Sequence, residues 1–125
     1  MPKYKNLREI LMDQKLASLG DSFVNFVYSL ALSKRKGEPI GAKVNSRVLS
    51  EALKKAGLRK LLPSRTDRHT QADAVEALIV YAWIKNVITM EEGVDVLERH
   101  EDPVEAFYTL LLKTTKKLKL ANIGL

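Results

Sequence analysis

Three carboxylates lie inside segments that are otherwise apolar. Asp21 is the one formal charge in residues 16–33, LASLGDSFVNFVYSLALS. Asp73 and Glu76 are the two acids of ADAVEALIVYAWI (72–84), and their three-residue spacing places them on the same side of a helix. A buried carboxylate is costly unless it is paired, hydrogen-bonded or bound to a cation, and neither segment contains a Lys or Arg. The sequence therefore predicts that a group outside these segments compensates the acids.

Two apolar helices packed with three acids between them would form a carboxylate cluster. Mutual repulsion would raise the proton affinity of the cluster unless a divalent cation occupied it. Mg²⁺ or Mn²⁺, held by a few carboxylates with water and a substrate phosphate, is the expected ion. Two simpler interpretations stay open: Asp21 could cap a helix that begins after Gly20, and Asp73 could cap a helix together with Thr70. Glu76 lies deepest in an apolar segment and is the hardest to explain by capping.

Helices must position these acids, because apolar residues recur at helical spacing along most of the chain and no stretch alternates with a period of two. The sequence therefore predicts an all-α fold of five or six helices. The expected helices cover about residues 4–15, 16–33, 46–56, 70–86 and 90–99, and a last helix opens at Asp102-Pro103.

The 16–33 helix is expected to bury one apolar stripe. On a helical wheel the stripe consists of Leu16, Leu19, Phe23, Phe26, Val27 and Leu30. Asp21 lies roughly opposite the centre of this stripe, beside uncharged neighbours such as Val24 and Asn25. We therefore expect Asp21 on a second, half-buried face, where Asn25 either supports the site or is simply a hydrogen-bonded amide.

Composition limits the class of protein. At 125 residues the chain has the length of one domain, residues 1–125, with enough residues for a sizeable core. It has no cysteine, which excludes disulfides and thiolate metal sites and favours a reducing, cytoplasmic location. The charged N-terminus does not resemble a signal peptide, and residues 16–33 are too polar for a membrane span. We expect no membrane partner.

The net charge favours a polyanionic partner. Lys and Arg number 21 against 15 Asp and Glu, for a formal net charge of +6 and a pI near 9.6. Such a balance is typical of nucleic-acid-binding domains. A surface rich in Lys, Arg and Glu also suits a thermophilic protein, and this purely structural explanation stays open.

The two acidic segments also resemble a known family. LGDSFV (19–24) is similar to the signature helix of the ribonuclease III catalytic domain, commonly Leu-Gly-Asp-Ala-Val-Leu, and ADAVEALI (72–79) closely matches its second acidic helix, Ala-Asp-Ala-Phe-Glu-Ala-Leu-Ile. Between them, residues 44–58 are similar to the intervening helix and its glycine stop. The resemblance covers about residues 16–90, and the order and approximate spacing of its parts agree.

By this resemblance the chain would be a single ribonuclease III-like all-α domain that forms a two-fold homodimer, with the 16–33 helix in the interface. Its activity would be metal-dependent endonucleolytic hydrolysis of phosphodiester bonds in double-stranded or structured RNA, with Mg²⁺ (or Mn²⁺) as cofactor. Asp21 and Glu76 would correspond to the metal-binding acids of the catalytic site, and Asp73 to a supporting acid.

One position departs from the longer members of that family. They have a glutamate four residues before the signature aspartate, whereas this sequence has Ala17. The length leaves no room for a double-stranded RNA-binding domain, so the chain resembles the short branch typified by the Mini-III ribonucleases, which also tends to have alanine there. The alternative function is a catalytically weak or inactive RNA-binding or assembly module that keeps the helical dimer.

Recognition of A-form RNA relies on phosphates, 2′-hydroxyls and shape, so basic residues are expected around the acids. The candidates for phosphate contacts are first Arg65, Arg68 and His69, and second Lys34, Arg35, Lys36 and Lys43. The first group directly precedes the segment with Asp73 and Glu76. His69 and His100 are far apart in the sequence, so neither is expected to bind metal.

Overall fold

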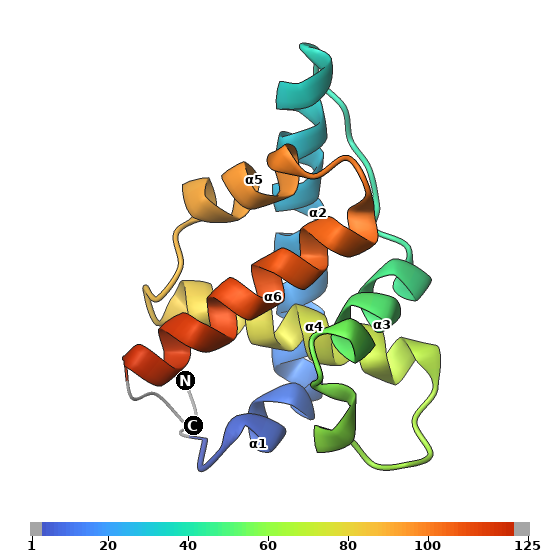
Figure 1. The fold of residues 1–125 in the computed structure, drawn as a ribbon, viewed down its shortest axis with the longest axis vertical. Coiled ribbons are helices and arrows are strands. Elements are labelled where there is room, and N and C mark those ends of the chain that lie inside the picture. Colours follow the sequence, from blue (N-terminus) through green and yellow to red (C-terminus); the bar gives the residue numbers. More distant parts are fainter. Residues whose placement is uncertain (1–3, 122–125) are drawn as a thin grey trace.

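The computed structural model describes residues 4–121, which form six α-helices and one short 3-10 helix (Figure 1). In chain order these are α1 (Leu7–Leu11), α2 (Gln14–Lys36), α3 (Ser46–Lys55), the 3-10 helix η1 (Arg59–Leu61), α4 (Arg68–Ile84), α5 (Met90–Arg99) and α6 (Pro103–Leu120). Residues 4–121 contain no β-strand, so the all-α prediction is confirmed for them. None of these helices is long and apolar enough to span a membrane.

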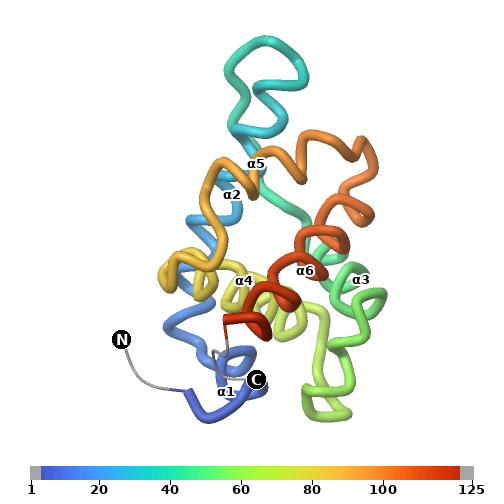
Figure 2. Tube along the Cα trace, turned by 60° about the vertical axis from the view of Figure 1, so that its left-hand side comes forward, coloured from blue at the N-terminus to red at the C-terminus, as the bar shows by residue number. Residues whose placement is uncertain are grey.

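Two helices, α2 and α4, form the centre of the fold. In Figure 1 the long α2 is vertical and α4 crosses it, while α6 passes in front of α4. α4 packs against α1, α2, α3 and α6, and most of its side chains are buried. It can be covered on nearly every side because its apolar part contains only two charged residues. α5 packs on α2 and α6, and Figure 2 shows it beside α2 from a second direction.

The boundaries of α2 differ from the predicted 16–33. Asp13 caps the helix, because its side chain accepts a hydrogen bond from the backbone N–H of Leu16 at 2.9 Å. The helix then continues to Gly37, whose φ of 73° suits a glycine at the C-terminal end. Asp21 therefore lies well inside α2, and the interpretation of Asp21 as an N-cap is wrong.

α4 begins two residues earlier than the predicted 70–86. Its N-cap is Asp67, whose side chain accepts a hydrogen bond from the backbone N–H of Thr70 at 2.8 Å. Thr70 is therefore inside the helix, and the predicted capping box of Thr70 with Asp73 is wrong. Asp73 lies within α4, three residues before Glu76, so neither acid is explained by capping.

The later helices were predicted more closely than the first. α5 coincides with the predicted 90–99, and α6 begins at Pro103 as expected. Strong capping residues mark both starts. The predicted 4–15 helix is the exception, since only Leu7–Leu11 are helical and Asp13 already caps α2.

The buried face of α2 is not the predicted stripe. Its buried residues are Leu16, Ala17, Gly20, Val24, Val27 and Ala31. Of the predicted stripe, Leu19 and Phe26 are exposed to 46% and 53%, and Phe23 and Leu30 are half-buried. The reason is the small distance between α2 and α4: small side chains fill the contact, and most of the larger apolar ones lie beside it.

Candidate active site

Gly20 lets α2 approach α4 closely. A Cβ atom at this position would lie 2.2 Å from the backbone carbonyl oxygen of Glu76 and 3.0 Å from the Cβ atom of the same residue. Any larger residue would therefore force the two helices apart. Because Asp21 directly follows Gly20, this contact brings Asp21 on α2 beside Glu76 on α4.

Glu76 is a buried acid without a cationic ion-pair partner. Only 7% of the residue is exposed, and none of the ion pairs within residues 4–121 includes it. Burial, a hydrogen bond with Asp21 and the charges of Asp21 and Asp73 raise the pKa of Glu76 to about 8, against an opposing effect of Lys43. The carboxyl of Glu76 is therefore mostly protonated at neutral pH when no cation is bound.

Asp73 belongs to the same electrostatic group. Its side chain is half-buried, and burial raises its pKa, while His69 lowers it and Asp21 raises it further. His69 lies four residues before Asp73 on α4, so the two side chains share one face of the helix. Asp21 on α2 therefore raises the pKa of both acids of α4, Asp73 and Glu76, although it comes from a different helix.

The acids line a cleft of about 710 Å³ between α2, α4 and the start of α3. Its lining includes all three acids together with Lys43, Arg68 and His69. The last three are exposed to solvent. One cleft therefore combines carboxylates with basic side chains, the arrangement expected where a cation and an anionic substrate meet.

The predicted phosphate contacts divide into two groups. Lys43, Arg68 and His69 line the cleft, and Arg65 is exposed on the loop that leads to α4. The others, Lys34, Arg35 and Lys36, lie in the last turn of α2 and do not line the cleft.

Arg35 has a structural role that the sequence did not indicate. Its guanidinium donates hydrogen bonds to the backbone carbonyl oxygens of Leu97, at 3.1 Å, and His100, at 2.8 Å, and also to that of Glu98. These carbonyls lie at the C-terminal end of α5, where a helix has no partners of its own for them. Arg35 therefore ties α2 to the end of α5.

Asn25 contacts a candidate catalytic acid directly. Its Nδ2 donates a hydrogen bond to Oδ1 of Asp21 at 3.1 Å, and its Oδ1 accepts one from the backbone N–H of Val44 at 2.8 Å. The sequence left open whether Asn25 supports the site or is a hydrogen-bonded amide; the amide is hydrogen-bonded, and one of its partners is Asp21. The four-residue spacing from Asp21 was the available signal.

Four polar residues of the cleft, Gln14, Ser18, Asn45 and Ser46, were not predicted. Ser18 lies three residues before Asp21, so helical spacing could have placed it on the same face. Gln14, Asn45 and Ser46 could not be found in this way, because their position in the cleft depends on where α2 begins and how α3 docks.

The oxygen donors of the cleft suit a hard divalent cation. Within residues 4–121, no three or more His, Cys, Asp or Glu side chains gather as ligands of one metal ion, and Ala17 contributes no ligand to the lining. Mg²⁺, however, is commonly held by one or two carboxylates while water and a substrate phosphate complete its shell. Asp21 and Glu76, which the Gly20 contact brings side by side, offer such a pair, with Asp73 beside them in the cleft.

The fold and the cleft define a class of protein, an all-helical domain whose two central helices present carboxylates to a cleft with exposed cations. A family model described as Ribonuclease III matches residues 14–120. The chain therefore belongs to the ribonuclease III family, and the resemblance of LGDSFV and ADAVEALI to that family is confirmed. The match extends from the first residue of α2 to the last residue of α6. No curated protein matches the chain.

Proposed function

We propose that this chain is a divalent-metal-dependent endoribonuclease that hydrolyses phosphodiester bonds in double-stranded or structured RNA. Membership of a family of RNA-processing nucleases supports this function. The observation on which it depends most is that the Gly20 contact holds the buried Glu76 against Asp21, while no ion pair within residues 4–121 includes either acid. Burying acids in this way costs free energy, and a bound cation would offset that cost.

Mg²⁺ or Mn²⁺ bound here would orient the scissile phosphate, lower the pKa of an attacking water and stabilise charge on the leaving 3′ oxygen. Asp21 and Glu76 would supply the carboxylate ligands, and Glu76 would hold the ion as a carboxylate because a nearby positive charge favours the ionised form. Asp73 acts as a supporting acid in the same cleft. No side chain is needed as the nucleophile, and the products are 5′-phosphate and 3′-hydroxyl ends.

Basic side chains around the cleft bind the RNA backbone in this proposal. The proposed phosphate contacts are Lys43, Arg68, His69 and Arg65, with Lys34 and Lys36 as outer contacts. Because these side chains meet phosphates and not base edges, the recognition depends on duplex shape more than on sequence. Arg35 is left out of the set, since its guanidinium is engaged at the end of α5.

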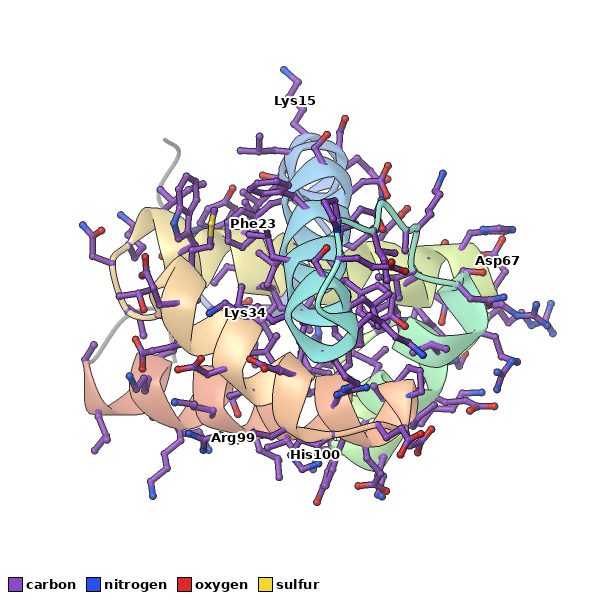
Figure 3. All side chains as sticks on the ribbon, turned by 90° about the horizontal axis from the view of Figure 1, so that it is seen from above. Lys15, Phe23, Lys34, Asp67, Arg99 and His100 are labelled. Atoms are coloured by element: carbon purple, nitrogen blue, oxygen red, sulfur yellow. The ribbon has the colours of Figure 1, made fainter. Side chains whose placement is uncertain are left out.

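The exposed apolar side of α2 supports a two-fold homodimer. Leu19 and Phe26 share one side of the helix, and Trp83 stacks on Phe23 with ring centroids 4.7 Å apart. Exposed fractions of 46%, 53% and 39% for Leu19, Phe26 and Trp83 are typical of an interface that a partner covers. Figure 3 shows Phe23 on the opposite side of α2 from Asp67, so a second copy seated there leaves the cleft open. Two copies present two sites, one for each RNA strand.

Substitution of Phe26 tests the homodimer. We expect wild type to be a dimer by light scattering after gel filtration and Phe26→Glu to be a monomer, because a charge cannot be buried unpaired in the interface. Leu112→Glu is the matched control, since Leu112 is a comparably exposed apolar residue, at 41%, on a different helix, α6. It should remain dimeric. A monomeric wild type would contradict the homodimer.

The test of the activity compares wild type with Glu76→Gln, which keeps the shape of the side chain and removes its charge. The substrates are a duplex RNA and one of its strands alone, each with Mg²⁺ or Mn²⁺. Wild type should cut the duplex, and the variant should cut at least about 100-fold more slowly. Removing a residue that only hydrogen-bonds to a metal ligand already lowers activity by about 10- to 100-fold, and removing the ligand itself should lower it more. Glu92→Gln, on α5 and outside the lining of the cleft, should cut as wild type does.

Failure of wild type to cut either RNA with both metals, at protein excess and low salt, would contradict the proposal. Normal cleavage by Glu76→Gln would instead show that the site is assigned to the wrong residues.

A second candidate is a catalytically weak or inactive RNA-binding or assembly module that keeps the helical dimer. Ala17 favours it, because this residue lines the cleft and leaves it with one acid fewer than a glutamate would. This function predicts RNA binding that weakens as salt rises and that is unchanged by Mg²⁺ or by Glu76→Gln. Such binding without cleavage would favour the second candidate over the first.

A further inference from the structure

A polar stripe on α2 holds the segment that leads to α3. Three side chains of the stripe, four residues apart, accept hydrogen bonds from backbone N–H groups two residues apart. These bonds join Val44 to Asn25 at 2.8 Å, Ala42 to Ser29 at 2.9 Å and Ile40 to Ser33 at 2.8 Å. Figures 1 and 2 both show residues 38–45 returning along α2. The segment is therefore fixed in register against the helix.

The two spacings explain why the register is stable. Residues four apart on an α-helix are separated by about 6 Å along its axis, and residues two apart in an extended chain by about 6.6 Å. Each turn of α2 therefore meets every second residue of the segment. Asp21 is the next residue of the same stripe, four before Asn25, so the stripe ends at the candidate active site.

Asn25 differs from the two serines because it donates to a carboxylate, whereas the serine hydroxyls donate to backbone carbonyl oxygens. Its Oδ1 accepts from the N–H of Val44, so its Nδ2 must face Asp21, where it donates at 3.1 Å. Lys43 directly precedes Val44 and lines the cleft. The amide of Asn25 therefore connects the carboxylate of Asp21 to the segment that brings the side chain of Lys43 to the same cleft.

We propose that Asn25 is a positioning residue of the active site: its amide orients the Asp21 carboxylate and fixes the segment that brings Lys43 to the cleft. The inference rests on the proposed function, because its consequence is a loss of cation binding and cleavage when Asp21 is misplaced. Ser29 holds the same segment without a hydrogen bond to an acid. It therefore provides a control that loses the backbone contact alone.

The experiment compares Asn25→Ala with Ser29→Ala. For Asn25→Ala we expect faster amide hydrogen exchange at Val44 in the metal-free protein. We also expect a half-saturating Mn²⁺ concentration about 10-fold higher, and a kcat for duplex RNA lower by about 10- to 100-fold. For Ser29→Ala we expect faster exchange at Ala42, with Mn²⁺ binding and kcat close to those of wild type. Circular dichroism and thermal unfolding verify that both variants are folded.

A further variant separates the two hydrogen bonds of the amide. Asn25→Asp keeps an acceptor for the N–H of Val44 but replaces the donor to Asp21 by a carboxylate oxygen. Exchange at Val44 should then resemble wild type, while kcat should fall as in Asn25→Ala. A normal kcat in Asn25→Asp would show that donation to Asp21 is not required, and would overturn the inference.

The remaining outcomes distinguish this inference from the proposed function. If wild type cuts RNA and Asn25→Ala matches it in kcat and Mn²⁺ binding, the inference fails and the proposed function stands. If wild type binds Mn²⁺ but cuts no RNA, the proposed function fails, and the Mn²⁺ titration with the exchange at Val44 decides the role of Asn25. If wild type neither binds Mn²⁺ nor cuts RNA, both fail.

Discussion

Glu76 on α4 and Glu92 on α5 are two glutamates with opposite surroundings. Glu92 forms ion pairs with Lys117 and Lys113, the second at 3.5 Å, and its Oε1 accepts a hydrogen bond from the N–H of Thr89 at 3.0 Å. The hydrogen bond from Lys117, and then that from Thr89, hold the pKa of Glu92 down at about 2. Glu76 takes part in no ion pair with the residues that the structure describes, and burial above all raises its pKa to about 8.

The difference separates an acid that stabilises the fold from an acid that is available to a ligand. Glu92 completes the capping box at the start of α5 and joins α5 to α6. Glu76 is more deeply buried, yet the described residues place no paired cation beside it. Acids of this second kind gather at functional sites. Substitutions that change the surroundings or the charge of Glu76 or Glu92 therefore test whether Glu76 belongs to a functional site.

The largest effect is expected from Gly20→Ala, which disturbs the close contact between α2 and the backbone of Glu76 on α4. The added Cβ would lie 2.2 Å from the carbonyl oxygen of Glu76, so α2 must move away from α4. We expect the free energy of unfolding to fall by about 3 kcal/mol and RNA cleavage to be lost, because Asp21 moves with α2. Urea unfolding and the duplex cleavage assay measure the two effects.

Gly41→Ala is the matched control for this prediction. No heavy atom lies within 4 Å of a Cβ placed at Gly41, and its φ is not in the left-handed range. Its free energy of unfolding should stay within about 0.5 kcal/mol of wild type, with normal cleavage. A Gly20→Ala protein as stable and as active as Gly41→Ala would show that the helix contact does not position the acids.

The sequence was sufficient where a local signal decides the structure. The start of α6 was predicted because Asp102-Pro103 is a strong N-terminal signal within two residues. Asp21, Asp73 and Glu76 were found because charges are rare in their segments. The prediction that they interact follows from the same scarcity, since no local cation could compensate them.

The sequence was insufficient to predict contacts whose two partners are far apart in the chain. Periodicity ranks Phe26 above Gly20 for burial, but it contains no information on how closely α4 approaches. Asn25 bonds a backbone group 19 residues later, and Arg35 bonds carbonyls more than 60 residues later. Backbone partners carry no side-chain signature, so no pattern in the sequence indicates these contacts.

Glu76→Gln should stabilise the metal-free protein at alkaline pH although it abolishes cleavage. The pKa of Glu76 rises from its usual 4.5 to about 8 in the folded chain, so the unfolded chain loses this proton first as pH rises. The free energy of unfolding of wild type therefore falls between about pH 4.5 and pH 8, by the contribution of Glu76 alone. Glutamine avoids this loss, and we expect a gain of about 1 kcal/mol at pH 8 that disappears near pH 4.5.

Urea unfolding with a chelator, at the two pH values, measures this gain. Added Mn²⁺ should then raise the Tm of wild type and leave that of Glu76→Gln unchanged, because only a folded state with the carboxylate binds the cation. A variant that is less stable than wild type at both pH values would mean that Glu76 contributes to the fold as Glu92 does, and the contrast would be lost.

The same substitution at Glu92 should give the smallest effect and the opposite sign. The pKa of Glu92 falls from its usual 4.5 to about 2 in the folded chain. Its ion pairs therefore stabilise the fold fully above pH 4.5 and are lost as pH falls toward 2.

Glutamine at position 92 can still accept a hydrogen bond from the N–H of Thr89. Glu92→Gln should therefore lower the free energy of unfolding by about 0.5 kcal/mol at pH 7, as expected for ion pairs that remain accessible to water. Salt at about 1 M should remove most of this difference, and cleavage should be unchanged. If Glu92→Gln proved more stable than wild type, a lowered pKa would not identify an acid that stabilises the fold. The contrast in pKa between Glu92 and Glu76 would then no longer support a functional role for Glu76.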